Sequence, residues 1–170
     1  MKKLLLLTLF FLIGSINAQS TKVSKARTYF NGGNAKSVEK DYYGAIADYT
    51  EAIKLIPNYT TAYFNRGLAK RRLKDYYGAI ADYTEAIKLT PNYGDAYVNR
   101  GVAKENLKDY NGAILDYTKA IEINPNYGNA YFNRGLAKYY LKDYYGACID
   151  AKKAKDLGYD STRLINVVCK

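Results

Sequence analysis

One asparagine recurs every 34 residues along this chain of 170 residues. The column consists of Asn31, Asn65, Asn99 and Asn133. A carboxamide carries both a hydrogen-bond donor and an acceptor, so each asparagine can pair with the N–H and C=O groups of an extended peptide backbone. A row of such groups favours binding of a peptide with little regard to its side chains. In the alternative interpretation, each amide serves only a neighbouring turn of its own chain.

An apolar column runs beside the asparagine column in the sequence. It consists of Phe30, Phe64, Val98 and Phe132, followed one helical turn later by Leu68, Val102 and Leu136. If these side chains line a groove, they form pockets for apolar side chains of a partner, and buried aromatic anchors carry much of the energy of binding. Apolar residues at helical spacing also form protein cores, so the sequence leaves both roles open.

Selectivity in such a groove depends on positions where the repeats differ. Arg71 and Arg72 stand where the other repeats have Ser37-Val38, Glu105-Asn106 and Tyr139-Tyr140. A guanidinium binds a carboxylate through two parallel hydrogen bonds, so the arginine pair suits an acidic group on a partner. The other interpretation is a charged face that is exposed to solvent.

Two further columns carry opposite charges. Their members are Arg66, Arg100 and Arg134, and Asp48, Asp82, Asp116 and Asp150. Both columns repeat, whereas a binding site should vary, so we predict structural ion pairs between helices. Partly buried pairs of this kind fix geometry more than they add stability. The spacing leaves open whether an arginine pairs within its own repeat or with the preceding one.

Catalytic chemistry finds little support in the sequence. The chain has no histidine, which excludes Ser-His and Cys-His nucleophilic sites and histidine metal sites. The acidic residues and glycines mostly recur once per repeat as turn, pairing or packing residues, and no phosphate-binding loop is present. We therefore expect neither an enzyme nor a cofactor or metal site.

The repeat itself predicts the elements that position these columns. One aspartate per repeat keeps the spacing: Asp41, Asp75, Asp109 and Asp143. Residues 41–55 recur letter for letter as residues 75–89. A period of this size is typical of stacked helical pairs. We expect each aspartate to cap a second helix, and each Pro-Asn-Tyr to mark the turn between repeats.

The residues at these positions resemble the tetratricopeptide repeat family. Its pattern is an aromatic residue, a glycine four residues later, Ala, aromatic and Ala in the second helix, and a final proline. The second and third repeats supply Tyr63, Gly67, Ala79, Tyr83, Ala86 and Pro91, and Tyr97, Gly101, Ala113, Tyr117, Ala120 and Pro125. The small residues let the two helices approach closely. The resemblance implies an all-α fold, a right-handed α-solenoid of about four helical hairpins in repeats 26–59, 60–93, 94–127 and 128–161.

The first and last repeats depart from the pattern. Gly32-Gly33 replaces Arg-Gly, Ala151 replaces a tyrosine, and Gly158-Tyr159 replaces Asn-Pro. Terminal repeats are expected to be atypical. We predict that Asp160–Lys170 forms a short capping helix over the fourth repeat, with residues 162–170 as its end.

The two cysteines lie in the last repeat and in this capping helix. A bond between Cys148 and Cys169 would tie the cap to the repeat, if the compartment is oxidising. The alternative is two reduced cysteines that act as small apolar fillers.

The family resemblance implies that the first helices of successive repeats line a concave groove, and similar asparagine columns occur in its peptide-binding members. The chaperone-binding branch uses a carboxylate clamp of Lys, Asn, Asn, Lys and Arg. Asn34 and Asn65 match that clamp, but Phe30, Asp95 and Asn99 stand at its cation positions. Capture of a chaperone's acidic tail is therefore not expected.

The N-terminal residues 1–18 are typical of a cleaved signal peptide, because a Lys-Lys start precedes an apolar run and a small residue, Ala18, ends the segment. The apolar run is shorter than the roughly 20 residues of a membrane-spanning helix. We expect export to the periplasm or exterior, no stable membrane span after cleavage, and a short N-terminal segment, 19–25, before the repeats.

Without Lys2 and Lys3 the chain keeps 24 basic and 16 acidic residues, a net charge of +8. This excess fits anionic polymers as an alternative ligand. No nucleic acid is expected, because the lysines and tyrosines mostly recur in structural columns. The sequence predicts an exported protein–protein interaction scaffold that binds a peptide or partner segment of unknown identity. A structural assembly subunit with no peptide ligand remains a further alternative, and the oligomeric state is not predicted.

Overall fold

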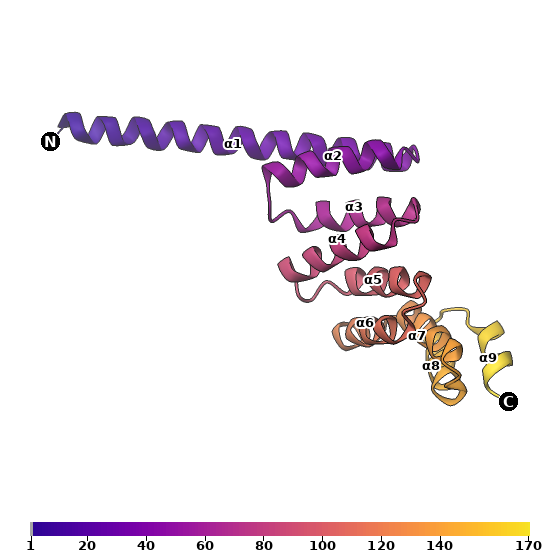
Figure 1. Ribbon diagram of the computed structural model, residues 1–170. Helices are drawn as coiled ribbons and strands as arrows, with labels where there is room; N and C mark the ends of the chain where they lie inside the picture. Colours follow the sequence, from indigo (N-terminus) through magenta and orange to yellow (C-terminus); the bar gives the residue numbers. More distant parts are fainter. Residues whose placement is uncertain (1) are drawn as a thin grey trace.

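The computed structural model describes the backbone of residues 2–170 and the side chains of residues 19–170. The described residues form nine α-helices and no strand. They are α1 (Lys2–Val38), α2 (Tyr42–Leu55), α3 (Thr60–Arg72), α4 (Tyr76–Leu89), α5 (Gly94–Asn106), α6 (Tyr110–Ile123), α7 (Gly128–Tyr140), α8 (Tyr144–Asp156) and α9 (Thr162–Val168). Figure 1 shows them as a stack of antiparallel hairpins. The predicted all-α arrangement of helical hairpins is confirmed.

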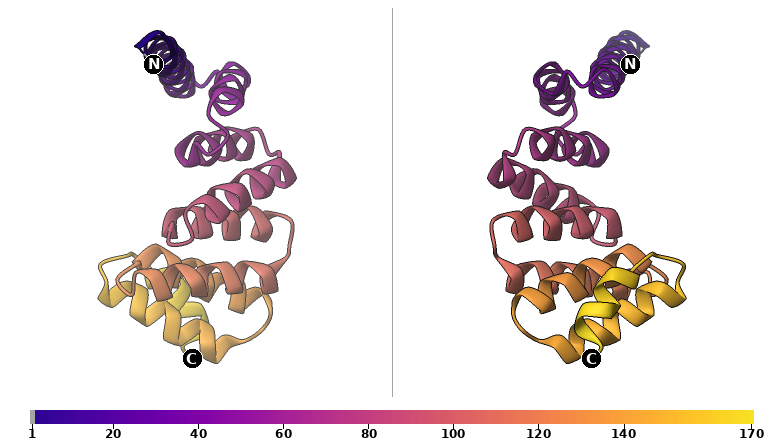
Figure 2. Two further views of the ribbon diagram at one scale, coloured as in Figure 1. Left: turned by 90° about the vertical axis from the view of Figure 1, so that its left-hand side faces the viewer. Right: turned by 90° about the vertical axis from the view of Figure 1, so that its right-hand side faces the viewer.

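Each helix packs mainly against the next one along the chain. The first helices of adjacent repeats also contact one another, because α1 touches α3, α3 touches α5, and α5 touches α7. Among the described residues, the second helices of adjacent repeats make no comparable contact with one another. Figure 2 shows how the hairpins rotate progressively along the stack. The first helices therefore form one continuous surface across all four repeats.

Helix α1 continues N-terminally past the first repeat, and Figure 1 shows this part extending beyond the stack. The predicted signal peptide, residues 1–18, lies outside the residues whose side chains are described. The predicted segment 19–25 belongs to α1 and is exposed along its whole length. Within the fully described residues, we find no helix that is long and apolar enough to cross a membrane.

Each second helix begins at the predicted aspartate. The carboxylate of Asp75 accepts a hydrogen bond of 2.9 Å from the backbone N–H of Gly78, and the other three aspartates make the same contact. The residue before each aspartate is a lysine in the left-handed region, with φ of 62° at Lys74. The first helix closes there through a hydrogen bond from the N–H of Asp75 to the carbonyl of Lys70. Glycine usually occupies the position after a helix that takes this conformation, so a lysine there gives no sign of the cap in the sequence. The cap is visible only in the backbone geometry.

The core of each hairpin is a tyrosine packed among alanines. Tyr117 is fully buried beside Ala113 and Ala120. A Cβ atom built on Gly101 would lie 2.6 Å from the Tyr117 ring, so the glycine is required for the close approach of α5 to α6. The predicted role of the small residues is confirmed.

The C-terminal helix covers the last repeat, as predicted, although it is shorter than the predicted range. Leu164 and Val168 of α9 are buried against Ala151 of α8. Cys148 and Cys169 form a disulfide, with a Cα–Cα distance of 5.1 Å. The disulfide joins α8 to the end of α9 and holds the cap in place.

Candidate functional site

The asparagine column lies on the continuous surface formed by the first helices. Asn31 is exposed, whereas Asn65, Asn99 and Asn133 are half-buried. Asn31 and Asn133 have no hydrogen-bond partner among the residues with described side chains. Two of the four carboxamides thus keep their whole hydrogen-bonding capacity for another molecule.

The other two asparagines each use one amide hydrogen within the chain. Asn65 donates to Oδ1 of Asn34 at 2.9 Å, and that oxygen also accepts from the hydroxyl of Tyr49 at 2.8 Å. Asn99 donates to the backbone carbonyl of Asp95, four residues earlier, at 2.8 Å. The alternative interpretation, in which the amide serves a turn of its own chain, is therefore correct for one N–H of Asn99. Each amide retains a second N–H, since a carboxamide has two.

The apolar column divides between core and surface. Val98 is only 5% exposed and belongs to the core, so the packing role describes it better than a groove contact. Phe64 and Phe132 are half-buried. Phe64 packs against Tyr93 with ring centroids 4.8 Å apart, and Phe132 packs against Tyr159 at 5.0 Å. Each of the two directly precedes an asparagine of the column in the chain.

The arginine and aspartate columns form the predicted structural pairs. Arg66 donates to both carboxylate oxygens of Asp82 in its own repeat, at 2.9 and 2.6 Å. Its third contact is a hydrogen bond of 3.0 Å to the hydroxyl of Thr50 in the preceding repeat. Lys70 adds an ion pair of 2.8 Å to the same aspartate. The spacing left open which repeat supplies the partner of each arginine. The structure shows that Arg66 binds a carboxylate of its own repeat and a hydroxyl of the preceding one.

Arg71, by contrast, has no hydrogen bond or ion pair with any residue whose side chain is described. It is half-buried, its Nε is covered, and its neighbour, the hydroxyl of the fully buried Tyr83, also has no partner there. Burial raises the pKa of Tyr83 to about 12, whereas the charge of Arg71 and its guanidinium, which lies close enough to act as a donor toward the phenol oxygen, lower it. Arg72, the next residue, is exposed. The sequence indicated the arginines but not the tyrosine beneath them.

The equivalent tyrosines of the neighbouring repeats have acceptors. Tyr49 donates to Asn34, and Tyr117 donates to Oε2 of Glu105 at 2.9 Å. Burial raises the pKa of Glu105, and the hydrogen bond from Tyr117 lowers it. Glu105 occupies the repeat position of Arg71, so a donor replaces an acceptor at this position of the second repeat.

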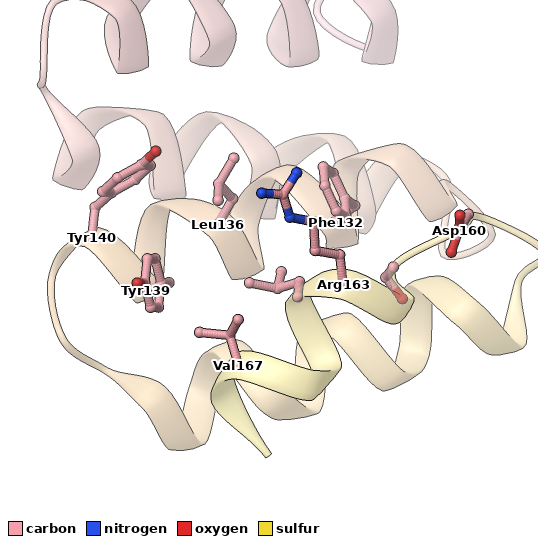
Figure 3. A pocket seen from close by; sticks show the side chains of 9 residues that line it. Phe132, Leu136, Tyr139, Tyr140, Asp160, Arg163 and Val167 are labelled. Atoms are coloured by element: carbon pink, nitrogen blue, oxygen red, sulfur yellow. The ribbon is translucent and has the colours of Figure 1, made fainter. Parts of the chain in front are cut away.

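A pocket of about 590 Å³ lies at the C-terminal end of the surface, between α7 and α9 (Figure 3). Tyr139 and Tyr140, which the sequence placed among the variable positions, line it together with Phe132 of the apolar column. Arg163 and Val167 of α9 close the other side, as Figure 3 shows. The cap therefore adds to the surface, which the sequence did not predict.

No group of three or more potential metal ligands occurs among the described residues. The described ion pairs and caps account for the repeated acidic residues. What the surface offers is carboxamides, half-buried aromatic rings and the guanidinium of Arg71.

Residues 60–93 and 94–127 match the family model described as tetratricopeptide repeat. The chain thus contains tetratricopeptide repeats: two of its hairpins match the family model, and all four follow that architecture. No curated protein matches the chain.

Solved structures of the same fold extend the comparison. The Arabidopsis OM64 TPR domain is 29% identical, with a TM-score of 0.68, and the match covers 70% of this chain and 98% of that one. The first TPR of Spaghetti (RPAP3), bound to the HSP90 peptide SRMEEVD, is 29% identical, with a TM-score of 0.69 and coverage of 71% and 95%. A crystal structure of MamA is 26% identical, with a TM-score of 0.77 and coverage of 85% and 87%. A repeat scaffold of this family is a protein–protein interaction module.

Proposed function

We propose that the protein is exported and holds an extended segment of a partner protein along the asparagine column. The observation that carries this proposal is the free hydrogen-bonding capacity of Asn31 and Asn133 on one continuous surface. Because carboxamides match the donor and acceptor of a peptide unit, they hold a backbone in any sequence context. Phe64 and Phe132 beside them provide apolar contact for the side chains of the segment.

A peptide-bound relative supports a peptide as the ligand, since the TPR of Spaghetti is bound to the peptide SRMEEVD. The acidic tail of a chaperone is not the ligand proposed for this chain. Phe30, Asp95 and Asn99 replace the cations of the carboxylate clamp, and the hydroxyl of Tyr127 donates to the Asp95 carboxylate. An anionic side chain there would repel an acidic tail.

The test begins with peptides selected on the wild-type protein from a random displayed library. Each selected peptide is then compared on the wild type and on the Asn65→Ala, Asn99→Ala, Asn133→Ala triple variant. We expect the variant to bind at least tenfold more weakly, because each lost hydrogen bond contributes about 0.5–1.5 kcal/mol. Asn111→Ala is the matched control, since this asparagine is exposed on the second helix α6.

Backbone recognition has a second signature in the peptide itself. N-methylation of single peptide bonds removes one donor without changing the side chain, so methylation at the contacted positions should weaken binding. Equal binding of all methylated forms, together with equal binding by the triple variant, would remove the asparagine column from the account.

The anionic-polymer alternative predicts a different salt response. Polyphosphate binding by an excess of lysines should weaken steeply as salt rises, because the attraction is screened. Peptide binding through neutral carboxamides should change little over the same range. Strong polyphosphate binding that is unaffected by the triple variant favours the alternative.

Export rests on the signal-peptide pattern of residues 1–18 and is supported by the Cys148–Cys169 disulfide, because disulfides persist in oxidising compartments. The intact mass of the protein recovered from the source cells tests it. We expect a chain that begins at Gln19 and is found outside the cytoplasm. A full-length chain with two free thiols would contradict export.

A further inference from the structure

Arg71 and Tyr83 form an incomplete polar site in the second repeat. The hydroxyl of Tyr83 and the Nε of Arg71 are both buried, and neither has a hydrogen-bond partner among the described residues. The other half-buried arginines, Arg66, Arg100 and Arg134, each bind an aspartate and a threonine hydroxyl. Buried polar groups without partners are uncommon because they lose their water contacts without compensation.

What the pair lacks is an acceptor. A guanidinium is all donor, and a tyrosine hydroxyl beside it is free to donate. In the neighbouring repeats, Asn34 and Glu105 supply that acceptor from within the chain. In the second repeat, the residues with described side chains provide none.

Glu105, which occupies the repeat position of Arg71 in the third repeat, is already engaged. Its carboxylate accepts the hydrogen bond of Tyr117, and moving it to Arg71 would leave Tyr117 buried without a partner. The charge of Arg71 also acts to lower the pKa of Tyr117, the residue that Glu105 contacts, although burial raises that pKa overall. The hydrogen bond from Tyr117 therefore holds Glu105 in place, and the guanidinium of Arg71 is left without a carboxylate partner.

We propose that Arg71 and Tyr83 bind a carboxylate of the peptide segment, so that the partner carries an acidic group at this point. This inference rests on the proposed function. Arg71 lies six residues after Asn65, a rise of roughly 9 Å along the axis of α3 and a turn of about 120° around it. A segment that follows the asparagine column across the helices would therefore reach this site with a long acidic side chain or with its end, not with its backbone. The site lies apart from the clamp positions of Phe30, Asp95 and Asn99.

Nε of Arg71 and the hydroxyl of Tyr83 are both buried, so binding requires the side chain of Arg71 to move and uncover them. No ion pair with a described residue opposes this movement, in contrast to Arg66, which is held by Asp82. The carboxylate then accepts hydrogen bonds from both donors.

The experiment uses the peptides selected on the wild-type protein. Each is synthesised in three forms. The first keeps its acidic side chains and has an amidated C-terminus, and the second has its acidic side chains changed to amides and keeps a free C-terminal carboxylate. The third, neutral form has neither kind of carboxylate. We expect one carboxylate form to bind about tenfold more tightly than the neutral form, which is the effect of one charge-assisted pair. Whichever form binds tightly identifies a side chain or the C-terminus as the source.

Three variants assign that preference. Arg71→Gln should abolish it, and Tyr83→Phe should reduce it to about threefold. Arg72→Gln is the matched control, because it removes the same charge from the adjacent exposed residue and should leave the preference intact. Loss of the preference in Arg72→Gln as well as Arg71→Gln would mean general charge attraction and would overturn the site.

The outcomes separate this inference from the proposed function. If no peptide binds the wild type, both fail. If peptides bind and depend on the asparagine column but all three forms bind equally, the carboxylate site alone is wrong.

The free protein gives an independent readout. Tyr83→Phe should leave the melting temperature unchanged or raised, because the hydroxyl has no partner to lose, whereas Tyr117→Phe should lower it by breaking the bond to Glu105. A drop of equal size in both variants would show that Tyr83 already has an acceptor in the free protein, and would contradict the proposal.

Discussion

Arg100 holds Asp116 through two parallel hydrogen bonds, one from Nε at 3.0 Å and one from Nη2 at 2.6 Å. The same guanidinium donates to Thr84 of the preceding repeat at 3.0 Å and lies 5.4 Å from the centroid of the Tyr97 ring. One arginine thus fixes the angle within its hairpin and the stacking of that hairpin on the one before. The surface on which the asparagine column lies depends on this stacking.

Asp116→Asn should therefore destabilise the protein more than Asp48→Asn does. The Asp116 side chain is 5% exposed and pairs with Arg100 and Lys104, whereas that of Asp48 is 17% exposed and pairs with Lys36 alone. We expect a loss of about 3 kcal/mol for the first change and below about 1 kcal/mol for the second. Urea unfolding of both variants gives the comparison. Equal losses in the free energy of unfolding would show that the buried Arg100–Asp116 pair contributes no more to stability than the more exposed Lys36–Asp48 pair.

The disulfide should stabilise the C-terminal end of the stack. The bond between Cys148 and Cys169 spans 21 residues, so its reduction should lower stability by about 3 kcal/mol. In a stack of repeats this loss is local, and amide hydrogen exchange should rise in α8 and α9 before it rises in α4. The Cys148→Ser, Cys169→Ser double variant should not respond to reductant. Uniform acceleration along the whole chain would contradict a local role.

Alkaline pH should unfold the protein through its buried tyrosines. Burial raises the pKa of Tyr83 from 10.0 to about 12, and it also raises the pKa of Tyr117. Since the unfolded chain loses these protons first, stability is complete below pH 10 and falls as pH rises toward 12. For Tyr83 the loss is about 2 to 3 kcal/mol. Urea unfolding at several pH values measures it, and Tyr83→Phe should show a correspondingly smaller loss.

The lysines before the capping aspartates mark a place where stability can be gained. Lys108 has a φ of 61°, a conformation that is unfavourable for any side chain and free of strain for glycine. Lys108→Gly should therefore raise the free energy of unfolding by about 0.5 to 1 kcal/mol. Lys119→Gly, in the middle of α6, should lower it by about 1 kcal/mol. A loss in both variants would mean that the lysine side chain itself is needed.

The sequence predicted features that repeat and missed features that depend on contacts between repeats. The period of the aspartates and prolines predicted the hairpins and the caps, because each involves a fixed spacing within one unit. The arginine and aspartate columns predicted structural ion pairs but left the partner of each arginine open, and the structure pairs Arg66 with Asp82. The role of Thr50 and the left-handed Lys74 were missed, since one depends on how repeats stack and the other on a backbone angle that lysine rarely adopts.

The candidate site was predictable only in part. The asparagine column follows from spacing, and its position on one surface follows from contacts between first helices. Val98 was placed with Phe64 and Phe132 because the pattern cannot separate a small buried residue from a large half-buried one. The proximity of Arg71 to Tyr83 could not be predicted, because the two residues lie on different helices and neither departs from the pattern of a helix.

The side-chain amide signals of the asparagines in an NMR titration with a selected peptide test the central claim most directly. The account predicts that the signals of Asn31, Asn65, Asn99 and Asn133 shift with the same affinity as the peptide binds, while the signal of Asn111 stays in place. If the peptide binds and shifts Asn111 while the column is unaffected, the peptide lies on the second helices and the account is contradicted.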